Sequence, residues 1–289
     1  MKYEIAIGDR AYSSWSMRGW LLFERFGIPC EVSHARLGTD QFAAMIKKFH
    51  PARTVPAVRF PEGAIGDSLA IAEELATRHP EAGIWPQDAG MRAIARSLAA
   101  EMHSGFKSLR SNCPMNLRAS YSKFPVDETV VGDLRRLEVI WDYARAESGG
   151  SGPWLCGDYS AADAFFAPVA ARIATYGLEV SASAQAYVKA HLNDAAFRRW
   201  RAMSLVDGDD RPEYFYDSPR RDWPRPRPLS ARAIEHGRPE NAACPYSGKP
   251  AIHLMEIDKR VFGFCNPFCR DKTVADPEAW PQFMKLYRQ

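Results

Sequence analysis

The order of strand and helix patterns in the first 80 residues constrains the fold of this chain more than any other feature. Residues 3–7 alternate in side-chain character, which predicts a strand. Gly27 and Pro51 each end a helical pattern. Further strands are predicted at 31–35, 57–60 and 64–66, and helices at 16–26, 41–49 and 68–78. This βαβα-ββα order predicts a small mixed sheet covered by helices.

The pattern becomes all helical over residues 87–204. Long periodic stretches cover 87–110 and 127–145. Ser160 is predicted to cap a further apolar helix, with Asp163 three residues later as in a capping box. This half of the chain therefore predicts a helical bundle domain.

A proline-rich segment follows the helical part. Five prolines and several arginines between Arg211 and Pro228 exclude a helix and predict an extended linker or a surface strap. Tyr214 and its two aromatic neighbours indicate that this segment docks on the protein. The predicted division is an α/β domain at 1–80, an all-α domain at 87–204, a linker or strap at 205–243, and a small cysteine-containing α+β module at 244–289.

Composition and charge exclude several classes of function. The chain has 289 residues, of which 46% are hydrophobic and 25% charged, and its net charge is only +3. These values favour neither nucleic acid nor a membrane surface as a partner. Met1 leads directly into a strand pattern, and no apolar run could span a bilayer. Cys30, Cys113 and Cys156 are scattered singly, which fits a reducing compartment, so we expect a cytoplasmic protein.

Three serines stand where the first strand leads into the first helix. Ser13, Ser14 and Ser16 offer hydroxyl donors beside the first backbone N–H groups of that helix. Donors and the helix dipole together favour an anion, and a thiolate is such an anion. The serines therefore predict a site that activates a bound thiol as a nucleophile. The alternative is that they only cap the helix.

Two later loops add polar groups near the same sheet. Pro56, after Val55, is predicted to be a turn proline at a strand entrance, and a cis bond there would turn the Val55 backbone toward an extended peptide ligand. The alternative is an ordinary loop proline. Asp67 and Ser68 begin the third helix, where they would bind an ammonium and a carboxylate while also capping the helix.

Residues 1 to about 205 resemble the cytosolic glutathione transferase family. The strings that carry the resemblance are Ser13-Ser14-Trp15-Ser16-Met17-Arg18, Val55-Pro56-Ala57-Val58, Asp67-Ser68-Leu69-Ala70-Ile71 and Ser160-Ala161-Ala162-Asp163. The resemblance implies a thioredoxin-like N-terminal domain, an all-helical C-terminal domain and a homodimer. The first string is similar to the zeta-class Ser-Ser-Cys-Ser signature, but Trp15 replaces the cysteine, and this argues against zeta-type maleylacetoacetate isomerase activity.

The same resemblance implies roles for individual residues. Ser13 would stabilise the glutathione thiolate, with Ser14 as the second choice. The other implied glutathione contacts are Ser16 in the first loop, Val55 and Pro56 at the cysteinyl backbone, Asp67 and Ser68 at the γ-glutamyl end, and Arg53 and Thr54 at the glycine end. The second substrate would lie against the helical domain, lined by Trp15, Met102, Phe106 and Arg110, with Tyr121 nearby. His103 receives no role.

Three cysteines cluster near the C-terminus with the spacing Cys-x20-Cys-x3-Cys. Cys244, Cys265 and Cys269 resemble the ligands of small treble-clef modules of the TRASH or YHS type, and they would hold zinc. Strands are predicted at 251–255 and 260–264 around an Asp258-Lys259 turn. Ser247 stands where a fourth cysteine is expected, so His236, His253 or Asp271 would complete the site. The alternative is a metal-free module with buried cysteines, docked through its aromatic residues.

Three functions compete. The first is a glutathione transferase that ionises the glutathione thiol through a serine and adds it to a small-molecule electrophile, or uses it in an isomerisation. The second is a non-catalytic binding or sensor protein with a C-terminal interaction module. The third is a glutathione-dependent disulfide reductase, which ranks last because that chemistry calls for a cysteine at Ser13.

Overall fold

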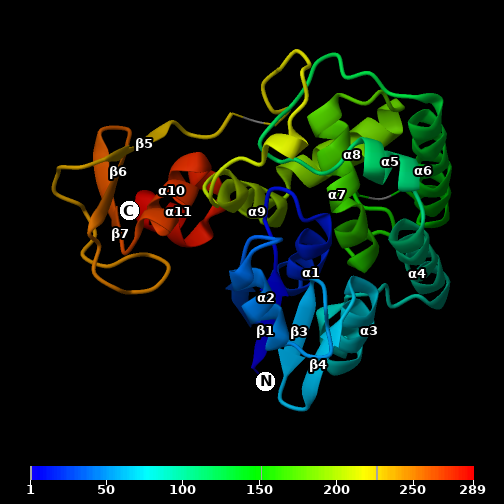
Figure 1. Cartoon of the computed structure of the whole chain (residues 1–289), viewed down its shortest axis with the longest axis horizontal. Coiled ribbons are helices and arrows are strands. Elements are labelled where there is room, and N and C mark those ends of the chain that lie inside the picture. The colour runs from blue at the N-terminus through cyan, green and yellow to red at the C-terminus, as the bar shows by residue number, and fades with distance from the viewer. Residues whose placement is uncertain (1, 151, 226) are drawn as a thin grey trace. The chain divides into compact units, whose positions relative to one another are not determined.

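The computed structural model describes residues 2–150, 152–225 and 227–289 (Figure 1). By internal contacts the chain forms two compact units. The first is Met1–Leu192 with Arg211–Pro224, and the second is Asn193–Asp210 with Arg225–Gln289. Among the described residues, no helix is long and apolar enough to cross a membrane.

A four-stranded sheet opens the first unit. Its strands are β1 (Tyr3–Ile7), β2 (Cys30–His34), β3 (Ala57–Phe60) and β4 (Gly63–Gly66), in the order β2-β1-β3-β4. β1 pairs with β2 in parallel and with β3 antiparallel, and β3 pairs with β4 antiparallel. The mixed sheet predicted from the strand patterns is therefore present.

Side-chain alternation along β1 gives the sheet two buried faces. Ile5 points to α1 (Ser14–Glu24), where a Cβ on Gly19 would lie 3.2 Å from the Ile5 side chain. Ala6 points the other way and packs with Met45 of α2 (Asp40–Lys47). α3 (Ser68–Arg78) packs beside α1. α1 and α3 thus lie on one side of the sheet and α2 on the other (Figure 1).

The helical part of the first unit is built around one fully buried helix. α7 (Ala161–Tyr176) packs against α1 and α4 (Ala89–Ser104), and all of its residues are buried. At its start the Asp163 carboxylate accepts hydrogen bonds from the Ser160 N–H at 2.9 Å, the Leu155 N–H at 3.2 Å and the Tyr187 hydroxyl at 2.8 Å. The remaining elements of this part are α5 (Lys107–Asn112), α6 (Glu128–Glu147), α8 (Ala182–Asn193) and the 3-10 turns Pro80–Ala82 and Pro212–Tyr214.

One predicted helix proves to be two. The periodic stretch at 87–110 breaks after Ser104, because Phe106 adopts a left-handed conformation with φ 56°. α5 then starts at Lys107 in a new direction. The break matters because it brings α5 next to the loop that begins α1.

The second unit contains a three-stranded antiparallel sheet with the order β5-β6-β7. Its elements are α9 (Ala195–Leu205), β5 (Ala231–Ile234), β6 (His253–Ile257), β7 (Arg260–Phe264), α10 (Pro267–Ala275), the 3-10 turn Pro277–Ala279 and α11 (Pro281–Tyr287). Asp258 and Lys259 both have positive φ, as the predicted hairpin turn requires. Phe262, Phe264 and Phe283 are fully buried in its core. The Asp276 carboxylate joins this unit's parts by binding Arg198 at 2.7 Å and Arg225 at 2.6 Å.

Candidate active site

Two neighbouring serines at the start of α1 have different surroundings. Ser13 is the N-cap: its oxygen accepts the Ser16 N–H at 3.3 Å, and its hydroxyl donates to the Ser16 hydroxyl at 2.8 Å. The Ser16 oxygen also accepts the Gly8 N–H at 2.9 Å, and both serines are buried. Ser14 is half-buried and lines a cavity. Of the three predicted serines, Ser14 is the one that faces open space.

The cavity beside Ser14 has a volume of about 410 Å³ and lies within the first unit. Its wall contains Tyr12, Ser14 and Trp15 from the serine loop, and Lys107 and Arg110 from α5. Arg172 from α7 and Tyr214 from the segment after α9 also line it. The predicted pocket residues Trp15 and Arg110 are therefore in the wall, whereas Met102 and Phe106 are buried in the core and do not line this cavity.

Arg172 reaches the cavity from the buried face of α7. Its Nε donates to the Cys113 carbonyl at 2.9 Å and its Nη1 to the Pro168 carbonyl at 3.1 Å, which fix the guanidinium. Its Nη2 lies 3.4 Å from the Ser14 hydroxyl oxygen and donates to it. Burial lowers the pKa of Arg172 to about 10, so the side chain stays charged at neutral pH.

Two more arginines surround the Trp15 ring. The guanidinium carbons of Arg18 and Arg110 lie 4.6 and 4.8 Å from the ring centroid. Arg18 is fully buried, and its Nε and Nη1 have no hydrogen-bond partner among the residues that the structure describes. Burial, and then the charges of Arg172 and Arg110, hold the pKa of Arg18 well below its usual range, while Asp67 opposes this shift.

The four cations near Ser14 have no acid in contact among the described residues. Within residues 2–150, 152–225 and 227–289, no ion pair joins Arg18, Lys107, Arg110 or Arg172 to a carboxylate. Arg18 and Arg172 are buried, Arg110 is half-buried and Lys107 is exposed. Burying a charge without a partner is costly, so an anionic partner is expected for the two buried arginines. The arrangement can therefore hold an anionic ligand, and it can stabilise negative charge that develops near Ser14.

The loop with Pro56 and the start of α3 lie on the same side of the sheet. The Val55–Pro56 peptide bond is cis, and Val55 is buried. Asp67 caps α3, and its second carboxylate oxygen lies 3.3 Å from Nε2 of His103. The Ser68 hydroxyl is fully buried, and no group in the described part of the chain forms a hydrogen bond with it. An unsatisfied buried hydroxyl at a helix start suits a ligand carboxylate.

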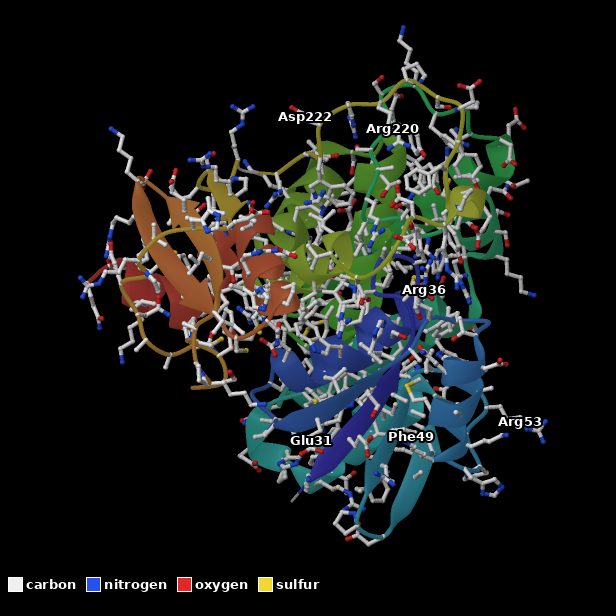
Figure 2. All side chains as sticks on the ribbon, turned by 60° about the vertical axis from the view of Figure 1, so that its left-hand side comes forward. Glu31, Arg36, Phe49, Arg53, Arg220 and Asp222 are labelled. Carbon is white, nitrogen blue, oxygen red and sulfur yellow. The ribbon has the colours of Figure 1, made fainter. Side chains whose placement is uncertain are left out.

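Four further residues named in the sequence analysis, Arg53, Thr54, Tyr121 and His103, do not line the cavity. Arg53 and Thr54 are exposed, and Figure 2 shows the Arg53 side chain extending away from the ribbon. Tyr121 is buried, and its hydroxyl accepts the N–H of Tyr216 at 3.0 Å. His103 contacts the Trp15 ring with a centroid distance of 5.2 Å.

Sequence reasoning placed Tyr12 in the serine loop but gave it no role, and it missed Lys107, Arg172 and Tyr214. Arg172 had a signal, since it is a lone charge in an otherwise apolar helix. Tyr214 belonged to an aromatic group that was expected to dock, but nothing in the sequence indicated where. Lys107 could be placed only once the break at Phe106 was known.

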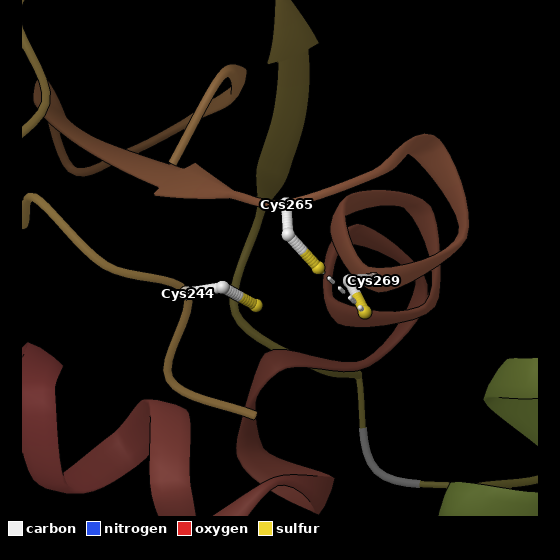
Figure 3. A group of neighbouring side chains, drawn as sticks. All are labelled: Cys244, Cys265 and Cys269. Atoms are coloured by element: carbon white, nitrogen blue, oxygen red, sulfur yellow. Dashed lines mark hydrogen bonds between the residues drawn. The ribbon is translucent and has the colours of Figure 1, made fainter. Parts of the chain in front are cut away.

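The C-terminal cysteines form a second candidate site in the other unit. Figure 3 shows Cys244, Cys265 and Cys269 converging, and their sulfur atoms all lie within 4.8 Å of one another. Burial alone would raise the pKa of Cys244, but N–H groups of Tyr246, Cys265 and Ser247 donate to its sulfur and lower the pKa to about 7. In the part of the chain that the structure describes, no histidine or carboxylate joins the three sulfurs as a fourth ligand.

Comparisons with known proteins agree with this architecture. The family model of the glutathione S-transferase N-terminal domain matches residues 12–78. A maleylacetoacetate isomerase from Rattus norvegicus is 28% identical over 177 residues, which are 60% of this chain and 78% of the rat protein. One from Dictyostelium discoideum is 30% identical over 114 residues, which are 39% of this chain and about half (52%) of that protein.

Solved structures show the same fold. A glutathione transferase homologue from Burkholderia (BGR1), with bound glutathione, aligns over 72% of this chain and 100% of its own, with 21% identity and a TM-score of 0.54. Glutathione transferase Omega 2S from Trametes versicolor aligns over 74% of this chain and 99% of its own, with 20% identity and a TM-score of 0.55. The predicted fold class is confirmed: a thioredoxin-like α/β domain, an all-helical domain and a small cysteine-containing α+β region. Residues 12–78 therefore match the glutathione S-transferase N-terminal domain, and the chain has the two-domain fold seen in these solved glutathione transferase structures.

Proposed function

We propose that this protein is a glutathione-dependent enzyme whose second substrate is an acidic, electrophilic small molecule. The observation that carries the proposal is one cavity in which the Ser14 hydroxyl faces Arg172, Arg110 and Lys107, none of them paired with an acid in the described chain. The matched N-terminal domain and the Burkholderia homologue solved with bound glutathione support glutathione as the thiol.

Glutathione would lie along the loops that begin at Val55 and Asp67. The Val55 backbone would pair with the cysteinyl residue, and the buried Ser68 hydroxyl would bind the γ-glutamyl carboxylate while Asp67 faces its ammonium. Pro56 would shape this loop, and Ser16 would support the serine loop from within. Arg53 and Thr54 would meet the glycine end, and both are exposed for such a contact.

Thiol activation is assigned to Ser14, with Ser13 holding the cap. A hydroxyl that donates to sulfur favours the thiolate, and the Arg172 guanidinium 3.4 Å from that hydroxyl adds positive charge. The N-terminus of α1 acts in the same direction. The thiol proton leaves to solvent as the thiolate forms.

The bound thiolate can serve two reactions. It adds to an unsaturated carbon, the C–S bond forms, and the π electron pair moves onto the conjugated carbonyl oxygen as an enolate. In conjugation, the adjacent carbon takes a proton from water. In isomerisation, rotation about the new single bond precedes return of the electron pair, which re-forms the double bond and expels the thiolate. Both reactions gain from negative charge stabilised by the arginines.

The relatives' named activity, maleylacetoacetate isomerisation, fits the second reaction because maleylacetoacetate carries two carboxylates. Trp15 stands in this loop where the zeta pattern has cysteine, and its ring is part of the cavity wall. We therefore place conjugation of an acidic electrophile first and isomerisation second.

Retention on immobilised glutathione tests the thiol site. We expect the column to retain the wild type but not Ser68→Ala, because the variant lacks the hydroxyl that would bind the γ-glutamyl carboxylate. Conjugation of 1-chloro-2,4-dinitrobenzene and of ethacrynic acid, an acidic enone, then tests catalysis. Absence of glutathione binding by calorimetry would overturn the proposal. Binding without turnover of any electrophile would favour the alternative, a non-catalytic sensor.

We also propose that Cys244, Cys265 and Cys269 hold a zinc ion. Zn–S bonds of ~2.3 Å in a tetrahedron place sulfurs about 3.8 Å apart, and the Cys265 and Cys269 sulfurs are 3.9 Å apart. The N–H donors on Cys244, and the Ser247 hydroxyl that donates to Cys265 at 3.2 Å, are partners typical of metal-bound thiolates. A water molecule would take the fourth position.

Elemental analysis of the purified protein tests the metal. We expect about one zinc per chain, lost in Cys265→Ser and kept in Cys156→Ser, whose cysteine lies outside the cluster. A metal-free protein that also fails to take up added zinc would overturn the assignment. The resemblance to glutathione transferases further leads us to propose a cytosolic homodimer, and light scattering of the purified protein checks its mass.

A further inference from the structure

The segment Arg211–Pro224, called here the strap, belongs to the first unit although α9, which precedes it, belongs to the second. Arg220 and Asp222, both labelled in Figure 2, lie near its C-terminal end at Pro224. Its first residues form the 3-10 turn Pro212–Tyr214. This turn lies at the cavity, because Tyr214 is part of the cavity wall.

A buried carboxylate fixes the beginning of the strap. Asp9 is 4% exposed, and one of its oxygens binds Nε of Arg211 at 3.1 Å. The other oxygen accepts the Leu37 N–H at 2.7 Å, and Arg211 also donates to the Leu37 carbonyl. The Asp9 carbonyl in turn accepts the Ser13 N–H at 2.8 Å. One residue thus supports both the serine loop and the strap.

The contacts of Arg211 also position the Tyr214 ring. The Arg211 N–H donates to the Tyr12 hydroxyl at 3.1 Å, and the rings of Tyr12 and Tyr214 lie 4.4 Å apart with an interplanar angle of 32°. The Tyr214 carbonyl accepts a hydrogen bond from Asn116 at 3.0 Å. Tyr214 is half-buried, so one side of its ring packs on the protein and the rest faces the cavity.

Further along, the strap is fixed to the helical part of the unit. The Arg221 N–H donates to the Ser120 carbonyl at 2.9 Å, and its Nη2 donates to the Ala174 carbonyl at 3.1 Å. The Ser122 N–H donates to the Pro219 carbonyl at 2.9 Å. The strap is therefore attached to the first unit at both ends. Tyr214, which lines the cavity, lies between the two attachments along the chain.

We propose that the strap forms the outer wall of the second-substrate site, and that Tyr214 selects planar unsaturated acids. The proposal rests on the proposed function of this cavity. Tyr12, Trp15 and Tyr214 provide aromatic surfaces, while Lys107, Arg110 and Arg172 provide positive charge. A flat conjugated group would pack against the rings as its carboxylate meets the cations. Tyr214 acts as a specificity residue, and Arg211 is a positioning residue that acts through it.

Binding of ethacrynic acid to the full-length protein, measured by calorimetry without glutathione, tests the wall independently of turnover. We expect Tyr214→Ala to weaken binding about tenfold and Tyr214→Phe to bind like the wild type, because the ring supplies the contact. Phe215→Ala is the matched control, since Phe215 lies on the same strap but does not line the cavity. It should bind like the wild type.

Steady-state kinetics add a second readout. Tyr214→Ala should raise KM for ethacrynic acid about tenfold while kcat and the KM for glutathione stay within twofold. Arg211→Ala should likewise raise KM for ethacrynic acid and leave kcat and the KM for glutathione unchanged. Arg211→Lys should restore part of the affinity for ethacrynic acid. A general loss of stability would not give this pattern.

Unchanged ethacrynic acid affinity in Tyr214→Ala would overturn the strap proposal, even if the wild type conjugates glutathione normally. An equal rise in the glutathione KM would overturn it too, because the strap would then support the serine loop instead of a substrate wall. Failure of the wild type to bind glutathione overturns the proposed function alone, since the affinity of the acid for the Tyr214 variants still decides the strap proposal.

Discussion

Ser13 and Ser14 are chemically alike, and their neighbours separate their roles. The Ser13 side chain forms both of its hydrogen bonds with Ser16, whereas the Ser14 side chain faces the cavity and Arg172. A capping hydroxyl contributes to helix stability, and a free hydroxyl can donate to a ligand. Substitution by alanine should therefore affect catalysis at Ser14 and stability at Ser13.

We expect Ser14→Ala to lower kcat/KM for conjugation by a factor of about 100, since it removes a donor to the thiolate. The pKa of bound glutathione, followed by thiolate absorbance in the ultraviolet, should rise in this variant. Ser13→Ala should instead lower the free energy of unfolding by about 1 kcal/mol through loss of the N-cap. A higher thiol pKa in Ser13→Ala, with none in Ser14→Ala, would reverse the assignment.

Arg110 offers a test of the charge in the cavity. Its guanidinium covers the Trp15 ring from a half-buried position on α5. Arg110→Gln should raise KM for ethacrynic acid about tenfold, because one charge-assisted hydrogen bond to the carboxylate is lost. The KM for uncharged 1-chloro-2,4-dinitrobenzene is the internal control and should stay within twofold. Equal changes for both electrophiles would mean that Arg110 supports the pocket shape and not the acid.

For single residues, the sequence predicted where the functional loops lie, but it did not predict which side chains in them face the cavity. The start of α3 at Ser68 follows from local signals, and a proline at a strand entrance led us to raise the cis form that the structure has at Pro56. The exposure of Ser14, and the convergence of Arg172 from 158 residues away, depend on tertiary packing. Helical periodicity shows that Arg172 lies in an apolar helix but not which cavity its guanidinium reaches.

Among the elements, α8 carries a buried titratable group. His191 is 1% exposed and packs between the rings of Trp154 and Tyr187. Burial, and then the charge of Arg25, lower the pKa of His191 from 6.5 to about 3. The folded state therefore holds this histidine neutral, while the unfolded state takes up a proton below pH 6.5.

This difference predicts a loss of stability in acid. As the pH falls from 6.5 toward 3, the unfolded chain binds the extra proton, so the free energy of unfolding decreases. At pH 5 the contribution is about 2 kcal/mol. Urea unfolding at pH 7.5 and pH 5 gives the free energy of unfolding at each pH. Its decrease on acidification should be smaller in His191→Gln than in the wild type by about 2 kcal/mol. Equal decreases in both proteins would show that other groups account for the acid sensitivity.

The ends of helices and strands show which features local sequence patterns predict and which they do not. The hairpin of β6 and β7 turns at Asp258 and Lys259 as its sequence predicts, because turn geometry is set by adjacent residues. The stretch from 87 to 110 has continuous helical periodicity, yet it breaks at Phe106. That residue is 6% exposed, so its packing into the core, which the sequence alone does not specify, accompanies the left-handed backbone.

At the scale of the whole molecule, the chain does not fill its two units in order. It leaves the first unit after Leu192, contributes α9 to the second, and returns to the first as the strap before ending in the second. A chain cut where the helical pattern ends would thus lose part of the first unit. The strap donates or accepts hydrogen bonds at Asp9, Asn116, Ser120 and Tyr121, all of which are buried.

Two truncations isolate this contribution. Chains ending at residue 205 and at residue 224 both lack the three-stranded sheet and both retain α9, so they differ in the strap and the short segment that leads to it. The shorter chain leaves the Asp9 carboxylate without Arg211 and uncovers the ring of Tyr121, which stacks on Tyr176. Buried groups that lose partners cost about 1–3 kcal/mol each. We expect the shorter chain to unfold roughly 5–10 °C lower by calorimetry. Equal unfolding temperatures would mean that the strap is an accessory to the first unit and not part of its structure.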